Sequence, residues 1–227
     1  TVRNARGTSH PNPISIAKHV MKCGAHSITI HLREDRRHIR DQDVVEICRN
    51  KKIITNLEIS LNDKIVKIAL KNKPNFICIV PEKRKEITTE GGLNLSKNSN
   101  KIKKIIKKFK KQKIRTSLFI NPNLRDIKIA KELDVDCIEL HTGKISDLIK
   151  SKKNYLNQYK KIKKCCEAAK KIGLEVHAGH GLDYKSTSIL SKLKEIEEFN
   201  IGHFIIGESI VHGLKNTVKR FKKISNT

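Results

Sequence analysis

The chain has 227 residues, of which 32% are charged, and its formal net charge is +26. This length suits one medium-sized domain with a substantial core, and recurring apolar runs exclude a disordered chain. No apolar run approaches the roughly 20 residues that cross a bilayer, which excludes a membrane-spanning protein.

Seven short runs rich in Ile, Val, Leu and Phe predict buried parallel strands. In chain order they are residues 27–32, 55–60, 76–81, 116–121, 137–142, 174–178 and 203–207. Amphipathic patterns between them predict helices at 13–22, 41–50, 62–71, 97–111, 124–133, 154–172, 186–199 and 208–224. No linker or low-complexity segment divides the chain, so we expect residues 1–227 to form a single domain.

Strict alternation of strands and helices predicts a parallel sheet covered by helices. Eight repeats at this length favour an α/β fold of the (β/α)8 TIM-barrel type with extra helices. Because the first predicted element is a helix and a barrel needs eight strands to close, we expect the first strand to be missing from this chain. The alternative is a doubly wound open sheet of seven strands.

The net charge has two interpretations. It invites nucleic-acid binding, particularly through the basic helix at 97–113. However, only 11 of the 49 cations are Arg, and aromatic residues make up 4% of the chain. Base recognition favours Arg, and stacking on bases needs aromatic rings. A solvated lysine surface is therefore the preferred interpretation, and nucleic-acid binding remains the alternative.

The six cysteines do not have the spacing of a zinc or disulfide framework. None forms a Cys-x-x-Cys pair, and Cys165 is adjacent to Cys166 in a helical pattern. Cys78 and Cys137 lie in strand-like runs, as small core residues do. This usage is typical of the reducing cytoplasm.

Ionisable side chains occur at the carboxyl ends of nearly all predicted strands, where barrels place their active sites. His31 ends one strand, Glu58 lies near the end of the next, and His180 follows another. A carboxylate such as Glu58 is costly to bury without a partner or a task. Each group alone also fits a structural hydrogen bond or a solvated charge, but together they predict an acid–base site.

Glycines near the last two predicted strands indicate a phosphate site, because barrels often bind phosphate there through backbone N–H groups. Gly181 follows one of these strands, and Gly202 precedes the other. Arg6, Arg33 and His38 supply cations on the same rim. The loop at 88–93, with paired Thr and Gly, has the pattern of a lid, the alternative being an ordinary surface connection.

Seven motifs in one order carry a resemblance to a known family. They are RNARGT, HLREDRRHI, NLE, VPEKR-x-E-x-TTEGGL, IELHTG, AGHGL and NIGH-x-IIG. From about Arg3 to its end, the chain resembles the pyridoxine 5′-phosphate synthase family. The resemblance implies a (β/α)8 barrel that condenses 1-deoxy-D-xylulose 5-phosphate with 3-amino-2-oxopropyl phosphate. It also implies a homo-octamer that needs no metal or organic cofactor.

The resemblance implies a role for each matching residue. His31 and Glu58 would accept protons, and His180 would donate one. The residues that would contact the deoxyxylulose phosphate are Arg33, His38 and Thr88. Those that would contact the amino-oxopropyl phosphate are Arg6, Gly181, Gly202 and His203.

Two features depart from the family pattern. Family members begin with a strand that ends in Asn-x-Asp-His, and this sequence starts just after that motif. Glu208 stands where some members carry Arg. A different phosphate-binding barrel, such as an isomerase or aldolase, remains an alternative. Aldolases commonly need a Schiff-base Lys at a strand end, and none of the seven predicted strands ends in Lys.

Overall fold

The computed structural model describes residues 2–82 and 91–225. Within these ranges, seven parallel strands form one sheet in the order β1 to β7, so each strand pairs with the next along the chain. The strands are β1 (Ile28–His31), β2 (Thr55–Ile59), β3 (Phe76–Ile79), β4 (Arg115–Ile120), β5 (Cys137–His141), β6 (Glu175–Gly179) and β7 (Ile196–Asn200).

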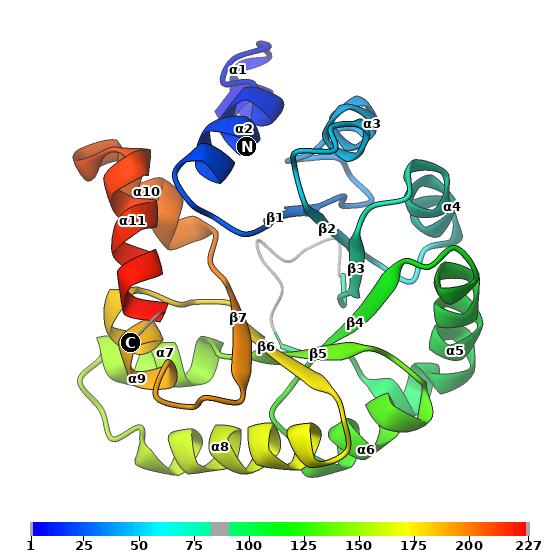
Figure 1. The fold of residues 1–227 in the computed structure, drawn as a ribbon, viewed down its shortest axis with the longest axis vertical. Helices are drawn as coiled ribbons and strands as arrows, with labels where there is room; N and C mark the ends of the chain where they lie inside the picture. Colours follow the sequence, from blue (N-terminus) through cyan, green and yellow to red (C-terminus); the bar gives the residue numbers. More distant parts are fainter. Residues whose placement is uncertain (1, 83–90, 226–227) are drawn as a thin grey trace.

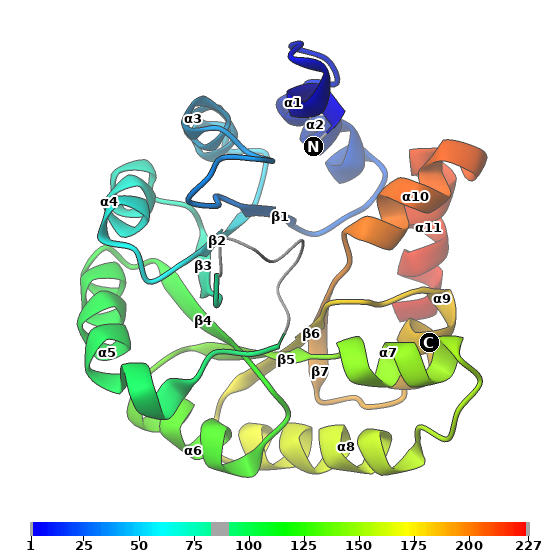
Figure 2. The ribbon, with the colours of Figure 1, turned by 180° about the vertical axis from the view of Figure 1, so that it is seen from behind.

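The sheet curls into a ring with the helices outside it, as Figure 1 and the reverse view in Figure 2 show. The helices are α1 (Val2–Arg6), α2 (Pro13–Lys22), α3 (Asp41–Arg49), α4 (Asp63–Asn72), α5 (Leu95–Lys111), α6 (Leu124–Glu132), α7 (Gly143–Lys150), α8 (Leu156–Lys171), α9 (Tyr184–Leu190), α10 (His203–His212) and α11 (Leu214–Ser225). This arrangement confirms the predicted TIM-barrel-like fold class.

The ring is open between β7 and β1 in the described part of the chain, where the sheet has its two edges. Side chains bridge this opening: Thr29 Oγ1 lies 2.7 Å from Asn200 Oδ1. A second contact, from Ser27 Oγ to Glu198 Oε2, is 3.5 Å long. The two edge strands are therefore linked by polar side chains.

The core lies between the strands and the helices. Outward-facing strand residues such as Leu57, Ile77, Leu118 and Ile138 are fully buried in one hydrophobic cluster with the helices. The residues that alternate with them face the interior of the ring and are largely polar. Barrel interiors are commonly filled with branched apolar side chains. The polar side chains in this interior are therefore not explained by core packing and indicate a functional site.

The last predicted strand is wrong. Residues 203–207 form the start of helix α10 and not a strand. The seventh strand is β7 (Ile196–Asn200), which overlaps the end of the helix that the sequence pattern predicts at 186–199. The apolar run in α10 resembles a buried strand, yet Ile206 is 54% exposed and Ile210 is 84% exposed. In β7, by contrast, Glu198 pairs in register with His177 of β6. A strand that turns carboxylates toward a polar interior lacks the apolar run that would identify it.

Other helix boundaries differ in smaller ways. The predicted helix at 208–224 consists of the end of α10 and all of α11, separated at Gly213. Gly213 has φ +77°, which lies in the left-handed region that ends helices. The short helices α1 and α7 are not predicted by the periodicity, since they have only five and eight residues.

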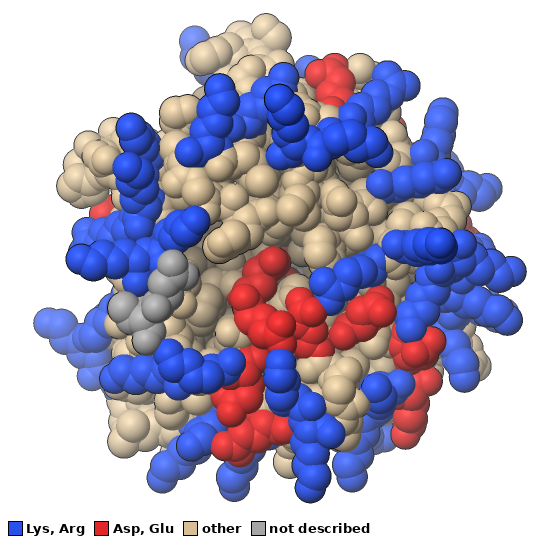
Figure 3. Space-filling view, in the orientation of Figure 1, with Lys and Arg blue, Asp and Glu red and all other residues tan. Residues whose placement is uncertain are grey.

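Charged side chains are distributed unevenly on the face shown in Figure 3. Asp and Glu gather at its centre, and Lys and Arg lie around the outside. Scattered peripheral lysines are what a solvated surface would show. In the described ranges, no helix has both the length and the apolar character of a membrane span.

Candidate active site

The carboxyl ends of β1 and β2 bring His31 and Glu58 together. The two residues pair in register across the strands, so both side chains face the interior. His31 Nδ1 lies 3.4 Å from Glu58 Oε2. On the other side of the imidazole, His31 Nε2 lies 3.6 Å from Glu82 Oε2. One imidazole thus lies between two carboxylates, an arrangement of groups that can exchange protons.

The two carboxylates beside His31 have different proton affinities. Burial raises the pKa of Glu58 above its ordinary value, and the neighbouring His31 only partly offsets this. Burial also acts on Glu82, but His31, the Glu34 backbone N–H at 2.8 Å and Arg33 together lower the Glu82 pKa. The two carboxylates are therefore shifted in opposite directions, with the pKa of Glu58 raised and that of Glu82 lowered.

The loop after β1 carries Arg33 and His38 and is held from outside by α1. Arg33 is buried, and its Nη2 lies 3.8 Å from Glu82 Oε1. Asn4 Nδ2 donates to the carbonyl of His38 at 3.1 Å. Arg3, on the same helix, forms a buried ion pair with Asp43 of α3. The first helix therefore holds the backbone at His38.

His180 and Gly181 follow β6 at the same end of the ring. Both have positive φ values, +79° and +75°. Burial lowers the pKa of His180, with smaller opposing effects from Asp147 and Lys150. A cavity of about 570 Å³ adjoins this loop. Its lining residues are Gly91, Asn121, His141, Gly143, Lys144, Asp147, Leu148, Ser151, Lys153 and His180.

Glu139 is an interior carboxylate that the sequence analysis did not select. It is 2% exposed, and Asn200 Nδ2 donates to its Oε2 at 3.0 Å. Gly179 of the next strand makes room for it, because a Cβ there would lie 2.0 Å from Glu139 Oε1. The sequence feature that could have identified Glu139 is the motif IELHTG, in which an acidic residue interrupts an apolar strand at a position that faces the interior.

Replacing Glu139 with glutamine is expected to stabilise the protein increasingly as the pH rises. Burial raises the Glu139 pKa well above 4.5, and the carboxylates of Glu58 and Glu198 raise it further. Such a group stabilises the fold below pH 4.5, and this contribution is lost as the pH rises through its folded pKa. Glutamine has no charge to develop and still accepts the Asn200 hydrogen bond.

The measurement is the free energy of unfolding from denaturant titrations between about pH 5 and about pH 9. We expect the variant's advantage to grow steadily as the pH rises over this range, because the buried Glu139 carboxyl becomes charged only in the wild-type protein. A difference that stays constant with pH would contradict a raised pKa at Glu139.

The remaining predicted residues are placed differently. Arg6 is exposed at the end of α1, which lies outside the ring in Figure 1. Gly202 caps α10, and the exposed His203 begins it, so neither lies in the predicted strand. Thr88 lies outside the described residues. The structure thus brings His31 and Glu58 into contact and sets Gly181 beside His180.

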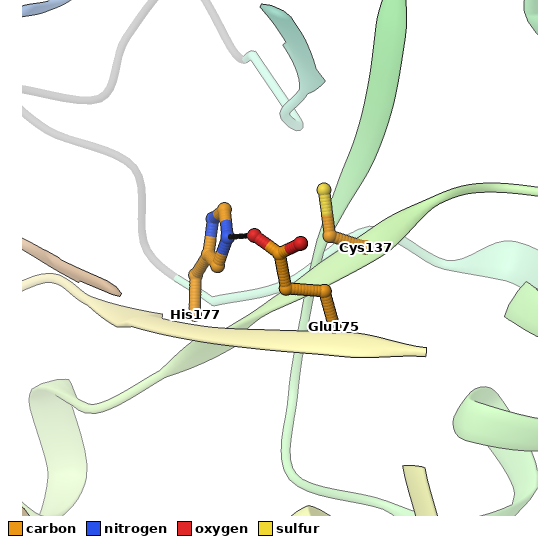
Figure 4. A group of neighbouring side chains, drawn as sticks. All are labelled: Cys137, Glu175 and His177. Atoms are coloured by element: carbon orange, nitrogen blue, oxygen red, sulfur yellow. Dashed lines mark hydrogen bonds and ion pairs between the residues drawn. The ribbon is translucent and has the colours of Figure 1, made fainter. Parts of the chain in front are cut away.

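Cys137, Glu175 and His177 form a group with metal-ligand chemistry near the other end of the ring (Figure 4). One ligand atom from each lies within 4.8 Å of the others. His177 Nε2 is 2.7 Å from Glu175 Oε1, and Arg115 pairs with Oε2. The hydrogen bond from His177 and the Arg115 pair lower the Glu175 pKa to about 2 despite its burial. Both carboxylate oxygens of Glu175 therefore already have protein partners, Arg115 and His177.

The fold and the site together define a barrel enzyme with acid–base groups at the carboxyl ends of its strands. Solved structures with similar folds include a 4-hydroxy-2-oxoglutarate aldolase (TM-score 0.64, 10% identity), covering 94% of this chain and 88% of that one. Another is the tryptophan synthase A-subunit from Pyrococcus furiosus (TM-score 0.61, 14% identity), covering 93% and 91% of the two chains. At these identities the likeness shows the fold alone.

Sequence comparison identifies the family. The family model described as pyridoxal phosphate biosynthesis protein PdxJ matches residues 1–227. A pyridoxine 5′-phosphate synthase from Pelagibacter ubique is 74% identical over all of this chain and 95% of its own length. The enzyme from Blochmanniella pennsylvanica is 46% identical over 99% of this chain and 91% of its own length. The chain belongs to the PdxJ family and has pyridoxine 5′-phosphate synthase activity.

Proposed function

We propose that this synthase condenses 1-deoxy-D-xylulose 5-phosphate with 3-amino-2-oxopropyl phosphate in the mouth of the ring. The amine of one substrate condenses with the ketone of the other and releases water. Loss of a second water and of inorganic phosphate, ring closure and aromatisation follow. These steps move protons at neutral pH, which suits imidazole and carboxylate groups.

His31 and Glu58 accept protons in this scheme, and His180 donates one. The observation that carries the proposal is the 3.4 Å approach of His31 to Glu58 at adjacent strand ends. The raised pKa of Glu58 makes its carboxylate a stronger base than an exposed Glu, which supports its role as a proton acceptor. The side chains of His31 and Glu58 are 15% and 22% exposed, so the pair is reached by solvent and substrate from the mouth of the ring.

Two phosphorylated substrates need two anion sites. In the proposal, Arg33, His38 and Thr88 contact the deoxyxylulose phosphate. Support for this group comes from the buried Arg33 and the fixed His38 backbone. The second group, which contacts the amino-oxopropyl phosphate, consists of Arg6, Gly181, Gly202 and His203. Gly202 and His203 stand at the N-terminus of α10, where backbone N–H groups favour anions.

The proposal extends to assembly and cellular location. The resemblance to the family supports a homo-octamer, and the exposed Ile206, Ile210 and Val211 of α10 support burial against another subunit. Sedimentation of the purified protein as a monomer would contradict this. The six free cysteines support a cytoplasmic location, which fractionation of the host cell checks.

The test of the reaction is an assay with the purified protein and both substrates. We expect pyridoxine 5′-phosphate, measured by mass spectrometry, and inorganic phosphate to appear in equal amounts. Omission of either substrate serves as the control. Absence of both products with both substrates present would contradict the proposed reaction.

A further inference from the structure

The backbone at His180 is held in a conformation that a histidine rarely adopts. Its φ of +79° lies in the left-handed region, and Gly181 continues there at +75°. A side-chain-bearing residue in this region costs on the order of 1 kcal/mol or more and persists only where its surroundings enforce it. The turn after β5 supplies these surroundings through His141, Thr142 and Gly143.

Thr142 contacts both peptide groups that flank His180. Its Oγ1 lies 2.7 Å from the carbonyl oxygen of Gly179 and 2.7 Å from that of His180. Its backbone N–H also donates to the Gly179 carbonyl, at 2.9 Å. Thr142 is fully buried, and hydrogen bonds are stronger away from water. Thr142 therefore fixes the orientation of the His180 backbone.

His141 fixes the ring of His180. The two imidazoles stack with centroids 4.8 Å apart and planes inclined by 29°. Phe119 meets the His141 ring edge-on at 5.3 Å, so the stack is supported from the barrel interior. Burial and the adjacent His180 lower the His141 pKa to about 4, which leaves it a neutral ring at physiological pH.

Gly143 allows the stack to form. A Cβ at this position would lie 2.8 Å from His141 Cε1, too close to be accommodated without movement of that ring, and 3.1 Å from His180 Cδ2, which would have to shift slightly. Gly143 is also the first residue of α7. Because its backbone is helical, an alanine would suit the helix and would be excluded only by the two rings.

We propose that His141, Thr142 and Gly143 are positioning residues for the synthase reaction, which together fix the ring and backbone of His180 beside the cavity of about 570 Å³. The inference rests on the proposed role of His180 as a proton donor. Misplacing a catalytic group by about 1 Å can cost about 100-fold in rate, so three residues that fix its position affect turnover through His180.

Charged and titratable groups from the packed elements also face this ring. His141 comes from β5, and Asp147 and Lys150 come from α7. Lys144 and Lys153 line the same cavity. All of these remain unchanged in a Gly143 variant, so a change in His180 titration there reports the stacking and solvation of the ring.

The first experiment compares Gly143→Ala with Gly207→Ala. Both place alanine in a helix, but a Cβ at Gly207 meets no atom within 4 Å. We expect the Gly143 variant to keep its thermal stability and to lose at least about 10-fold in kcat with little change in KM. The Gly207 variant should match wild type in both. A normal kcat in Gly143→Ala would overturn the inference.

The second measurement does not depend on activity. Exchange of the histidine C2 hydrogen with deuterium, followed by mass spectrometry across pH, gives the pKa of His180. In Gly143→Ala we expect this pKa to rise toward 6.5, because the displaced ring regains water. If the pH profile of His180 exchange is the same in Gly143→Ala and in wild type, the positioning role is overturned and the proposed function is unaffected. A His180→Ala variant with normal turnover would instead overturn the proposed function.

Thr142→Val tests the backbone contacts, with Thr187→Val as its matched control. Thr187 is also fully buried, but its hydroxyl has no hydrogen-bond partner in the described part of the chain. We expect a kcat loss of at least about 10-fold only in the Thr142 variant, with recovery in Thr142→Ser. Equal activity of the two valine variants would argue against the role of Thr142.

Discussion

Replacing Glu58 with glutamine is expected to lower kcat by about 100-fold or more. Glutamine preserves the size and the polar contacts of the side chain but cannot take up or release a proton. Glu58 lies 3.4 Å from His31, and its pKa is raised by burial. The proposed base would therefore be removed with little change in packing. The measurement is the steady-state rate of pyridoxine 5′-phosphate formation.

Glu167→Gln is the matched control, because Glu167 is half exposed on α8 and pairs only loosely with Lys163 at 3.8 Å. Surface ion pairs of this kind contribute little to stability. We expect this control to retain the wild-type rate. A Glu58→Gln enzyme with wild-type kcat would remove Glu58 from the mechanism, provided that thermal unfolding shows the same fold.

Replacing His180 with alanine is expected to have an effect of similar size, about 100-fold or more on kcat. The imidazole stands at the cavity wall in a strained backbone conformation, and alanine leaves no group there to donate a proton. Because the variant lacks only the imidazole group, imidazole added to the solution should restore part of the rate. Turnover measured with and without imidazole checks both expectations.

His212→Ala provides the control for the loss of a histidine. His212 is 58% exposed at the end of α10 and lies 3.4 Å from Glu208 in the preceding turn. We expect its rate to be unchanged and insensitive to imidazole. Equal rates for the His180 and His212 variants would show that His180 takes no part in proton transfer.

The predictability of the fold differed between elements for a physical reason. Strands such as β2 and β5 bury Leu57 or Ile138 against the helices, so their apolar pattern is visible in sequence. Strand β7 carries Glu198 toward a polar interior, and α10 carries an apolar run that stays exposed at Ile210. A local pattern reports only hydrophobicity. It therefore predicts a strand where α10 lies and a helix where β7 lies, because the burial of these two elements is decided by distant partners.

The candidate site was predictable as a set of motifs but not as a set of contacts. The position of His31 and Glu58 at strand ends follows from the chain, since parallel strands place their carboxyl ends together. The contact of Glu139 with Asn200 does not, because it depends on the register of strands separated by 61 residues. The same holds for the stack of His141 on His180, which the bare backbone of Gly143 permits.

The sequence by itself determined the barrel class, the family and the residues that carry its motifs, since periodicity and motif order are properties of the chain. Only the tertiary structure decided that the interior of the ring is polar, that β7 and not residues 203–207 completes the sheet, and that the turn after β5 holds His180. The reason is that burial and strand register arise from contacts between residues far apart in the chain. No local pattern contains them.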